Sequence, residues 1–387
     1  MKLLYIVPYL SEFFRGPMYY QLEDLSKHIE VMTFTSSEKS YQYYAKREKI
    51  KEKEVVLNQT WKWKRFDIEF KIRGLVWLKD FATTLKQEEA DIINSNEYYQ
   101  PTTWQSFKIA KEKGISFIMT QRRPEFVGAI EKLSFELIFN RIGKEIVYGS
   151  DAIECISTVA KELLLKTFPD LNKDKIFVIH NSVDLHRFED KDGENFKEEF
   201  GIPKDKKIIL NFSRIFRQKR IDLLLRIFSL VKKEVKDAYL VVGGARHPGE
   251  WKTVQKLTKE LGLENDVKFI DVLPNERIKD ILDCCDVFCL TSEKEPFGYV
   301  YLEAMACEKP VMGFNVGGAS DIIIDGQNGH LINFGNLEDY AKKIVMLLQD
   351  NQKKMKMGKI GRKYVEKRFT IEEATEKRLK LYNSLVK

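Results

Sequence analysis

The sequence lacks a long apolar run. No stretch of about 18 consecutive apolar residues, the length that marks a membrane-spanning helix, occurs in its 387 residues. The start, MKLLYIVPYLSEFF, is apolar, but no small-residue cleavage site follows it. It therefore predicts a buried first strand rather than a signal peptide. We expect a cytoplasmic protein, either free or peripheral on the inner face of the membrane.

Cysteine and histidine are also scarce, with five of each. Cys284, Cys285 and Cys289 lie close together without the paired CxxC spacing of a zinc site. No two histidines have the i, i+4 spacing of a zinc protease motif. Asp190-Lys191-Asp192 resembles a metal-binding Asp-x-Asp, but it lies in a charged segment rather than at a strand end. We expect packed, reduced thiols, no metal and no cofactor.

The excess of positive charge is modest, since 65 Lys and Arg against 58 Asp and Glu give a formal charge of +7. This charge permits contact with phosphates or an anionic membrane, and does not require nucleic acid. We therefore expect no nucleic-acid partner. A polyanion-binding module stays open as an alternative class, and it would bind with a steep dependence on salt.

Short apolar, β-branched runs alternate with amphipathic stretches along nearly the whole chain. The runs are KLLYIVPY, IEVMTFT, DIINSN, ISFIMT and AIECIST in the first half, and KIILNFS, YLVVGG, VKFIDV, DVFCLTS and PVMGFN in the second. This alternation predicts α/β units around parallel sheets. A polar stretch, 184–206, interrupts the rhythm and indicates a linker. We predict domains over 1–184 and 185–365, and a closing helix over 366–387 that could return to the first domain.

Chemistry in an open parallel sheet lies at the carboxyl ends of the strands. Arg214 and Lys219 follow KIILNFS, where a bidentate guanidinium and an ammonium could hold a diphosphate; a cation pair on a helix surface is the alternative. Gly243-Gly244 follows YLVV and would let the backbone approach a ligand closely. A plain tight turn explains this glycine pair equally well.

The stretch SEKEPFGYVYLE places two carboxylates around a turn that opens a helix. The amide groups of Gly298, Tyr299 and Val300 would form the anion-binding end of that helix. Glu303, one turn into the helix, could accept hydrogen bonds from a ribose diol. Glu295, before the turn, could face the group on the other side of the phosphates. A further glycine loop, Gly317-Gly318-Ala319-Ser320-Asp321, could line the same site.

The order of these motifs resembles the retaining glycosyltransferases of the GT-B fold, often called family 4. The resemblance covers residues 178 to about 334, beginning with VIHNSVD. It implies two Rossmann-like domains facing across a cleft, an acceptor-binding N-terminal domain and a nucleotide-sugar-binding C-terminal domain. It also implies that Arg214 and Lys219 bind the donor diphosphate, Glu303 the ribose and Glu295 the transferred sugar.

The reaction implied by this resemblance moves a hexose from a nucleotide sugar to a hydroxyl of a glycan or lipid-linked acceptor. The configuration at the anomeric carbon is retained, and no metal is required. UDP-hexose and GDP-hexose both remain open as donors, and we favour UDP. Such an enzyme would act in the synthesis of cell-surface glycans, polysaccharides or glycolipids.

The N-terminal half resembles the family only in outline. Gly16 precedes a helix after the first strand, and the strand ISFIMT ends in Gln121-Arg122-Arg123 where many relatives have a histidine. We assign these four residues to the acceptor side. Gln121 can hydrogen-bond a hydroxyl but cannot act as a base. Arg122 and Arg123 could bind an anionic acceptor or could be solvated.

The segment TWKWKRFDIEFKIRGLVWL, 60–78, interleaves aromatic residues with cations. It could rest on an anionic membrane or pack its aromatic side chains inward as a strand and a helix. Two other functions stay open for the whole chain. They are a sugar-nucleotide epimerase of the same fold, which would need acid and base residues, and a non-catalytic sugar-nucleotide-binding protein.

Overall fold

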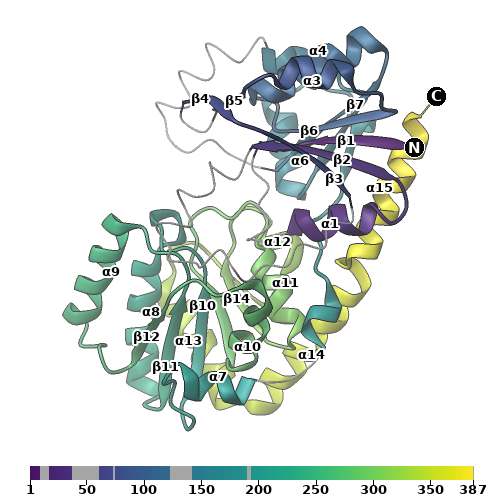
Figure 1. The fold of residues 1–387 in the computed structure, drawn as a ribbon. Coiled ribbons are helices and arrows are strands. Elements are labelled where there is room, and N and C mark those ends of the chain that lie inside the picture. The colour runs from purple at the N-terminus through teal and green to yellow at the C-terminus, as the bar shows by residue number, and fades with distance from the viewer. Residues whose placement is uncertain (9–16, 37–60, 73–74, 123–141, 190–192, 387) are drawn as a thin grey trace. The chain divides into compact units, whose positions relative to one another are not determined.

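A computed structural model describes residues 1–8, 17–36, 61–72, 75–122, 142–189 and 193–386 (Figure 1). The chain divides into two compact units. Unit 1 consists of residues 1–181 and 371–387, and unit 2 consists of residues 182–370. None of the described helices is both long and apolar enough to cross a bilayer.

Unit 1 is built on a seven-stranded sheet in the order β3-β2-β1-β6-β7-β8-β9, in which every neighbouring pair is parallel. The central strands are almost fully buried on both faces of the sheet, and for this reason their sequences are continuous apolar runs. The strands are β1 (Lys2–Ile6), β2 (Glu30–Ser36), β3 (Lys62–Phe66), β6 (Ile92–Asn96), β7 (Ser116–Gln121), β8 (Ala152–Cys155) and β9 (Ile176–Val178).

The described helices of unit 1 include α1 (Pro17–Leu25), α3 (Phe81–Gln87), α4 (Pro101–Lys113), α6 (Thr158–Thr167) and α15 (Ile371–Leu385). A separate antiparallel hairpin is formed by β4 (Ile68–Ile72) and β5 (Leu75–Leu78). Helix α15 comes from the far end of the sequence and packs on α1 (Figure 1). The closing helix of the chain is therefore part of unit 1, and it begins at Ile371.

A buried ion pair fixes α15 to the sheet. Arg378 on α15 donates from Nη2 to Glu154 Oε1 on β8 at 2.6 Å, and the two side chains are 4% and 0% exposed. Tyr382, one turn later, accepts a hydrogen bond from the Asn94 amide at 3.2 Å. Because a buried charge is costly unless it is paired, Glu154 requires a cation from another part of the chain.

Unit 2 is built on a six-stranded parallel sheet in the order β12-β11-β10-β13-β14-β15. Its strands are β10 (Lys207–Phe212), β11 (Ala238–Gly243), β12 (Val267–Ile270), β13 (Val287–Leu290), β14 (Val311–Phe314) and β15 (Gly329–Ile332). Its α-helices are α7 (Gly193–Glu199), α8 (Ile221–Glu234), α9 (Pro248–Glu260), α10 (Ile278–Asp283), α11 (Tyr299–Ala306), α12 (Ala319–Ile322), α13 (Leu337–Gln349) and α14 (Asn351–Arg368).

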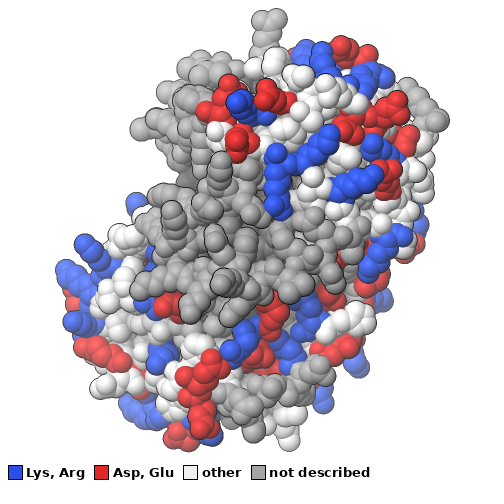
Figure 2. All heavy atoms as spheres, viewed as in Figure 1, with Lys and Arg blue, Asp and Glu red and all other residues white. Residues whose placement is uncertain are grey.

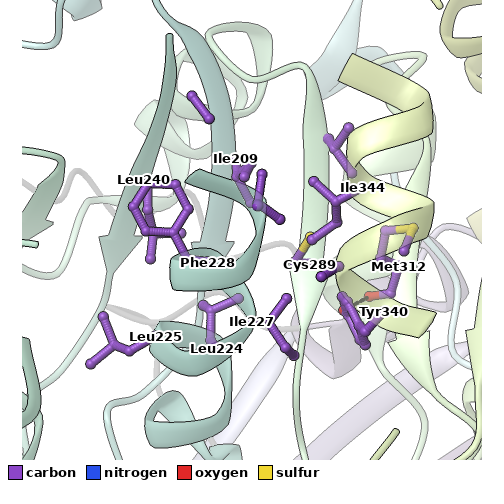
Figure 3. Close-up of a cluster of buried hydrophobic side chains, with 14 of the residues drawn as sticks. Ile209, Leu224, Leu225, Ile227, Phe228, Leu240, Cys289, Met312, Tyr340 and Ile344 are labelled. Carbon is purple, nitrogen blue, oxygen red and sulfur yellow. Dashed lines mark hydrogen bonds between the residues drawn. The ribbon is translucent and has the colours of Figure 1, made fainter. Parts of the chain in front are cut away.

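The core of unit 2 lies between this sheet and helices α8 and α13. Figure 3 shows Ile227 and Phe228 of α8 and Ile344 of α13 directed at strand residues such as Cys289. The fully buried Tyr340 of α13 places its hydroxyl 3.1 and 2.8 Å from the carbonyl oxygens of Leu290 and Met312, which accept its hydrogen bond. The five cysteines are all free thiols and four are buried, which agrees with the prediction of packed, reduced cysteines.

These two sheets confirm the predicted fold class of two Rossmann-like α/β units. In each sheet the first strand of the unit is central. The next strands along the chain are added on one side of it and the later strands on the other side, so the strand order reverses next to the first strand. The reversal lies between β1 and β6 in unit 1, and between β10 and β13 in unit 2. Ligands of open α/β sheets bind at the carboxyl ends of the strands at such a switch point.

Two predictions on connecting segments need correction or resolution. The polar stretch 184–206 is not a linker, because helix α7 within it buries Phe196, whose ring stacks on Phe200 at 4.3 Å. In the stretch 60–78, Trp61 and Phe66 are buried and Lys62 and Lys64 pair with glutamates. Trp61 and Phe66 thus pack inward, as the second alternative expects, although the second part of the stretch is the β4–β5 hairpin rather than a helix.

Candidate functional site

The candidate site of unit 2 is built on the carboxyl ends of β10 and β13. These strands are neighbours, with Leu210 opposite Phe288. Arg214 and Lys219 follow β10, and Glu295 follows β13. The parallel pairing therefore brings the predicted cations and the first predicted carboxylate to the same edge of the sheet.

Lys219 and Glu295 form an ion pair at this edge. Lys219 Nζ lies 2.6 Å from Glu295 Oε2, and the two side chains are 18% and 8% exposed. The same carboxylate oxygen accepts a hydrogen bond from Ser292 Oγ at 3.0 Å. Glu295 is thus held in a fixed position by two donors, and its negative charge is balanced by the ammonium group.

The loops that carry this ion pair are bonded to each other. Thr291 Oγ1 donates a hydrogen bond to the Lys219 or Arg220 carbonyl, at 3.1 and 3.0 Å. The Glu293 amide donates to the Gln218 carbonyl at 3.0 Å. These bonds join residues more than 70 positions apart, so the site is preorganised by the fold rather than by local sequence.

Arg214 is exposed, and no hydrogen bond or ion pair of its side chain is found within the described residues. The backbone beside it runs along the Gly243-Gly244 turn, where the Ser213 amide donates to the Gly243 carbonyl at 2.9 Å. Gly244 has φ of +126°, and a Cβ there would lie 2.2 Å from the Ser213 carbonyl oxygen. Only glycine fits this approach, so the turn serves to position the loop of Arg214.

Gly298 forms the start of α11 in a left-handed conformation, with φ of +91°. Tyr299 and Val300 are the first two helical residues and are partly exposed. The first-turn amides of a helix have no intrahelical acceptors and carry the positive end of its dipole. The start of α11 follows Glu295 by a short turn, and it is suited to an anion.

The glycine loop after β14 packs directly on Glu295. The Gly318 amide donates to the Glu295 carbonyl at 2.8 Å. At Gly317, where φ is +53°, a Cβ would lie 2.0 Å from that same carbonyl oxygen. The loop therefore holds the backbone of the acidic residue, and glycine at 317 is a requirement of that contact.

Glu303 lies inside α11 and is 6% exposed. Burial raises the pKa of its carboxyl to about 7, and the nearby Arg187 guanidinium opposes part of this rise. Arg187 Nη1 lies 3.7 Å from Glu303 Oε1, and its Nη2 donates to the Asn275 carbonyl at 2.9 Å. Arg187 comes from a short 3₁₀ turn, Leu185–Phe188, and the sequence did not single it out.

Unit 1 has a second polar cluster at the switch point between β1 and β6. Arg122, at the end of β7, donates from Nε to Asn96 Oδ1 at 2.6 Å, from Nη2 to Tyr5 Oη at 2.7 Å and from Nη1 to Asn181 Oδ1 at 3.3 Å. Neighbouring Gln121 is buried. The Arg122 side chain is therefore held in place at the carboxyl edge of the sheet, rather than freely solvated.

Some predicted site residues cannot be placed. Gly16, Arg123 and the Asp190–Asp192 segment lie outside the described residues. Among the residues that the structure describes, no group of three or more His, Cys, Asp and Glu side chains could hold a metal ion.

Two family models match the chain in succession. Residues 19–187 match the model described as Glycosyltransferase Family 4, and residues 192–364 match the model described as Glycosyl transferases group 1. Together they cover both units. The chain belongs to the family 4, group 1 glycosyltransferases.

Curated relatives support this membership over part of their length. The chain is 29% identical to the N-acetyl-alpha-D-glucosaminyl L-malate synthase of Bacillus anthracis over 62% of this chain and 62% of that protein. It is 27% identical to the D-inositol 3-phosphate glycosyltransferase of Corynebacterium urealyticum over 62% of this chain and 58% of that protein. The matched stretches thus span about three fifths of these relatives.

The fold is shared along the whole chain with solved GT-B structures. The alignment with the structure of Anabaena HepE in complex with UDP and glucose covers 99% of this chain and 100% of the HepE chain, with a TM-score of 0.79. The sequence identity is 18%. This similarity shows the GT-B fold and carries no residue-level conclusion.

Proposed function

We propose that the protein transfers a hexose from a UDP-activated donor to a hydroxyl group of a glycan or lipid-linked acceptor. The transfer proceeds with net retention at the anomeric carbon and requires no metal ion. The Lys219–Glu295 ion pair at the carboxyl edge of β10 and β13 carries this proposal. It combines a cation for a diphosphate with a fixed carboxylate for sugar hydroxyls at one switch point.

The bond that breaks joins the anomeric carbon to the donor diphosphate, and its electron pair leaves with the diphosphate. Arg214, Lys219 and the start of α11 are the groups that stabilise this developing charge. Removal of one such donor from an active site typically costs about 10²–10³ in rate. The ion pair has a second effect, because Lys219 neutralises Glu295 and prevents it from repelling the diphosphate.

Glu303 is the residue assigned to the donor ribose. A ribose diol can donate two hydrogen bonds to a carboxylate, and such bonds favour the ionised form. With the pKa of Glu303 raised to about 7 by burial, the free protein holds this carboxyl partly protonated near neutral pH. Donor binding should therefore ionise Glu303 and release a proton.

UDP is favoured as the donor nucleotide because HepE was solved in complexes with UDP, with UDP and glucose, and with UDP-glucose. GDP-hexose remains the second candidate. The acceptor would approach the carboxyl edge of the unit 1 sheet, where Arg122 is held by three hydrogen bonds and two of its five N–H groups have no acceptor among the described residues.

We infer that the acceptor carries a negative charge near its reacting hydroxyl. The names of two relatives contain L-malate and D-inositol 3-phosphate, and both compounds combine hydroxyl and anionic groups. Arg122 would bind that anion, while Gln121 would hydrogen-bond a hydroxyl without acting as a base. The acceptor proton would pass to the departing diphosphate oxygen. A phosphate-bearing lipid-linked acceptor meets this description.

Thermal-shift measurements with UDP, GDP, ADP and CMP identify the nucleotide, since a ligand that binds only the folded state raises the melting temperature. The preferred UDP- or GDP-hexose is then incubated with and without acceptor, and the product is followed by NMR. The proposal requires acceptor-dependent nucleotide release and an unchanged anomeric configuration. Interconversion of the donor sugar without release would instead show an epimerase, and stabilisation without turnover a binding protein.

A further inference from the structure

The net positive charge of the chain, that is, the excess of Lys and Arg over Asp and Glu, can be assigned to one helix. Helix α14 contains six lysines, two arginines and one glutamate, which give it a formal charge of +7. The whole chain has the same formal charge of +7, so the remainder of the sequence is formally neutral. On the face shown in Figure 2, Lys and Arg side chains are interspersed with Asp and Glu. The excess charge is therefore a property of α14, not of the general surface.

The buried side of α14 determines which side faces solvent. Met357, Gly358, Gly361 and Val365 are buried. A Cβ on Gly358 would lie 1.8 Å from the Glu308 carbonyl oxygen, so the helix backbone lies directly against the turn that follows α11. This close packing fixes the rotation of α14 about its own axis.

The opposite side of α14 combines exposed lysines with exposed apolar side chains. Met355 is 50% exposed and Ile360 is 37% exposed. No hydrogen bond or ion pair of Lys356, Lys359 or Lys363 is found within the described part of the chain, whereas Lys354 at the flank pairs with Asp286. One shallow surface depression is lined by Gln352, Met355, Lys356, Lys359, Ile360 and Lys363, whose spacing of three and four places them on one helix face.

We propose that this outer face of α14, defined as Met355, Lys356, Lys359, Ile360 and Lys363, docks on the surface of an anionic lipid bilayer. Unpaired lysines attract anionic headgroups, and apolar side chains between them can enter the boundary of the acyl chains. The lysine stems extend along apolar surface while their ammonium groups stay in water. The lysines thus match the anionic headgroups, and the apolar side chains match the boundary of the acyl chains.

A nucleic acid would be complementary only to the lysines of this face. It would bind the lysines but would leave Met355 and Ile360 without an apolar partner, and the face offers no aromatic ring on which a base could stack. The charged stretch 60–78 is less suited to a bilayer, because Lys62 and Lys64 are paired with Glu30 and Glu88. The proposed docking surface lies wholly within unit 2 and does not depend on the proposed reaction.

The test is flotation of the full chain with vesicles of phosphatidylcholine alone, or with about one third phosphatidylglycerol. The charge variant is K356Q/K359Q/K363Q, and the apolar variant is M355Q/I360Q. The matched control is K252Q/K256Q/K259Q, which removes three exposed lysines from α9 and changes the net charge equally. Far-UV circular dichroism and thermal unfolding of each variant report separately on its folding.

We expect binding to the anionic vesicles only, and roughly a hundredfold weaker partitioning for the charge variant, from about fivefold per lysine. The apolar variant should also bind more weakly at unchanged charge, and the α9 control should bind as the wild type does. Equal losses in the two triple-lysine variants would overturn the proposal in favour of a general charge effect. Tighter binding to single-stranded DNA than to vesicles, with M355Q/I360Q indifferent, would overturn it in favour of a polyanion.

Discussion

Arg187 and Glu303 face each other in unit 2, with 3.7 Å between Nη1 and Oε1, although they lie far apart in the chain. The guanidinium only partly offsets the effect of burial, and the pKa of Glu303 stays at about 7. Ionisation of Glu303 in the folded protein is therefore unfavourable below neutral pH. In the ligand-free protein, the free energy of unfolding should decrease as pH rises from 4.5 to about 7.

The assignment of Glu303 to the donor ribose predicts that the affinity for UDP-glucose increases with pH, because a ribose diol donates its hydrogen bonds to the ionised carboxylate. We expect about tenfold tighter binding at pH 8 than at pH 6. UDP-glucose itself has no group that titrates in this interval. Calorimetry in buffers of different ionisation enthalpy would measure the proton released. In the variant E303Q, binding should be weaker and independent of pH; a pH profile that survives in E303Q would assign the effect to another group.

Removal of Arg187 should shift this profile rather than abolish it. In R187Q the guanidinium no longer opposes burial, so the pKa of Glu303 rises and the increase in affinity moves to higher pH. A uniform loss of affinity at every pH would show that Arg187 acts on the ligand directly. The same calorimetric titration distinguishes the two results.

Lys219 should contribute to turnover more than to folding. In K219A the departing diphosphate loses a cation and Glu295 keeps its charge without a counter-ion, so we expect kcat to fall about 10²–10³-fold. K233A removes an exposed cation from the other end of α8 and serves as the control, with unchanged kcat. Steady-state kinetics and far-UV circular dichroism should be measured together. Normal turnover in folded K219A would remove Lys219 from the site.

Glycine at 317 should be required for the position of Glu295. In G317A the added Cβ meets the Glu295 carbonyl oxygen, so the loop must move and donor binding should weaken at least tenfold, a penalty of the order of 1.4 kcal/mol. G326A is a matched control, because Gly326 also has a positive φ of +74°, but a Cβ added there would have no neighbouring atom within 4 Å. If the two variants lose equal affinity, the backbone conformation alone explains the effect.

Removal of only one partner of the Glu154–Arg378 pair should destabilise the protein more than removal of both partners. R378M leaves the fully buried Glu154 carboxylate without a cation, and we expect a loss of about 3–5 kcal/mol in the free energy of unfolding. K377A, next to it, breaks only the exposed pair with Glu373 and should cost less than about 1 kcal/mol. Urea unfolding of each variant measures the difference. A double variant, E154M/R378M, should recover most of the stability.

Regular elements and strand-end motifs can be predicted from the sequence because both depend on local patterns. The strands with continuous apolar runs are predicted. β9 has only three residues, and β15, GHLI, has only two large apolar side chains, so neither stands out. Lys219 and Glu295 are found because each follows a predicted strand. The strand AIEC contains the glutamate at position 154, but no local pattern identifies Arg378 as its partner.

Residues that act through long-range contacts could not be inferred. Arg187 lies in a short turn that has no hydrophobic period, and its relation to Glu303 arises only when the chain folds. Tyr5, Asn96 and Asn181, which hold Arg122, come from three distant segments. The charge of α14 is present in the sequence, but its two faces become distinct only once the packing of its glycines is seen.

The two covalent connections between the units run next to each other. Val183 pairs in parallel with Thr370, and its amide donates to the Phe369 carbonyl at 2.8 Å. Residues 182–370 are therefore an insertion into unit 1 whose two ends are adjacent. Residues 371–387 return to unit 1. Under the proposed function, in which unit 2 binds the donor, a chimaera that takes its donor specificity from another glycosyltransferase should replace residues 182–370 and retain 371–387. An exchange of everything after residue 181 would remove helix α15 from unit 1.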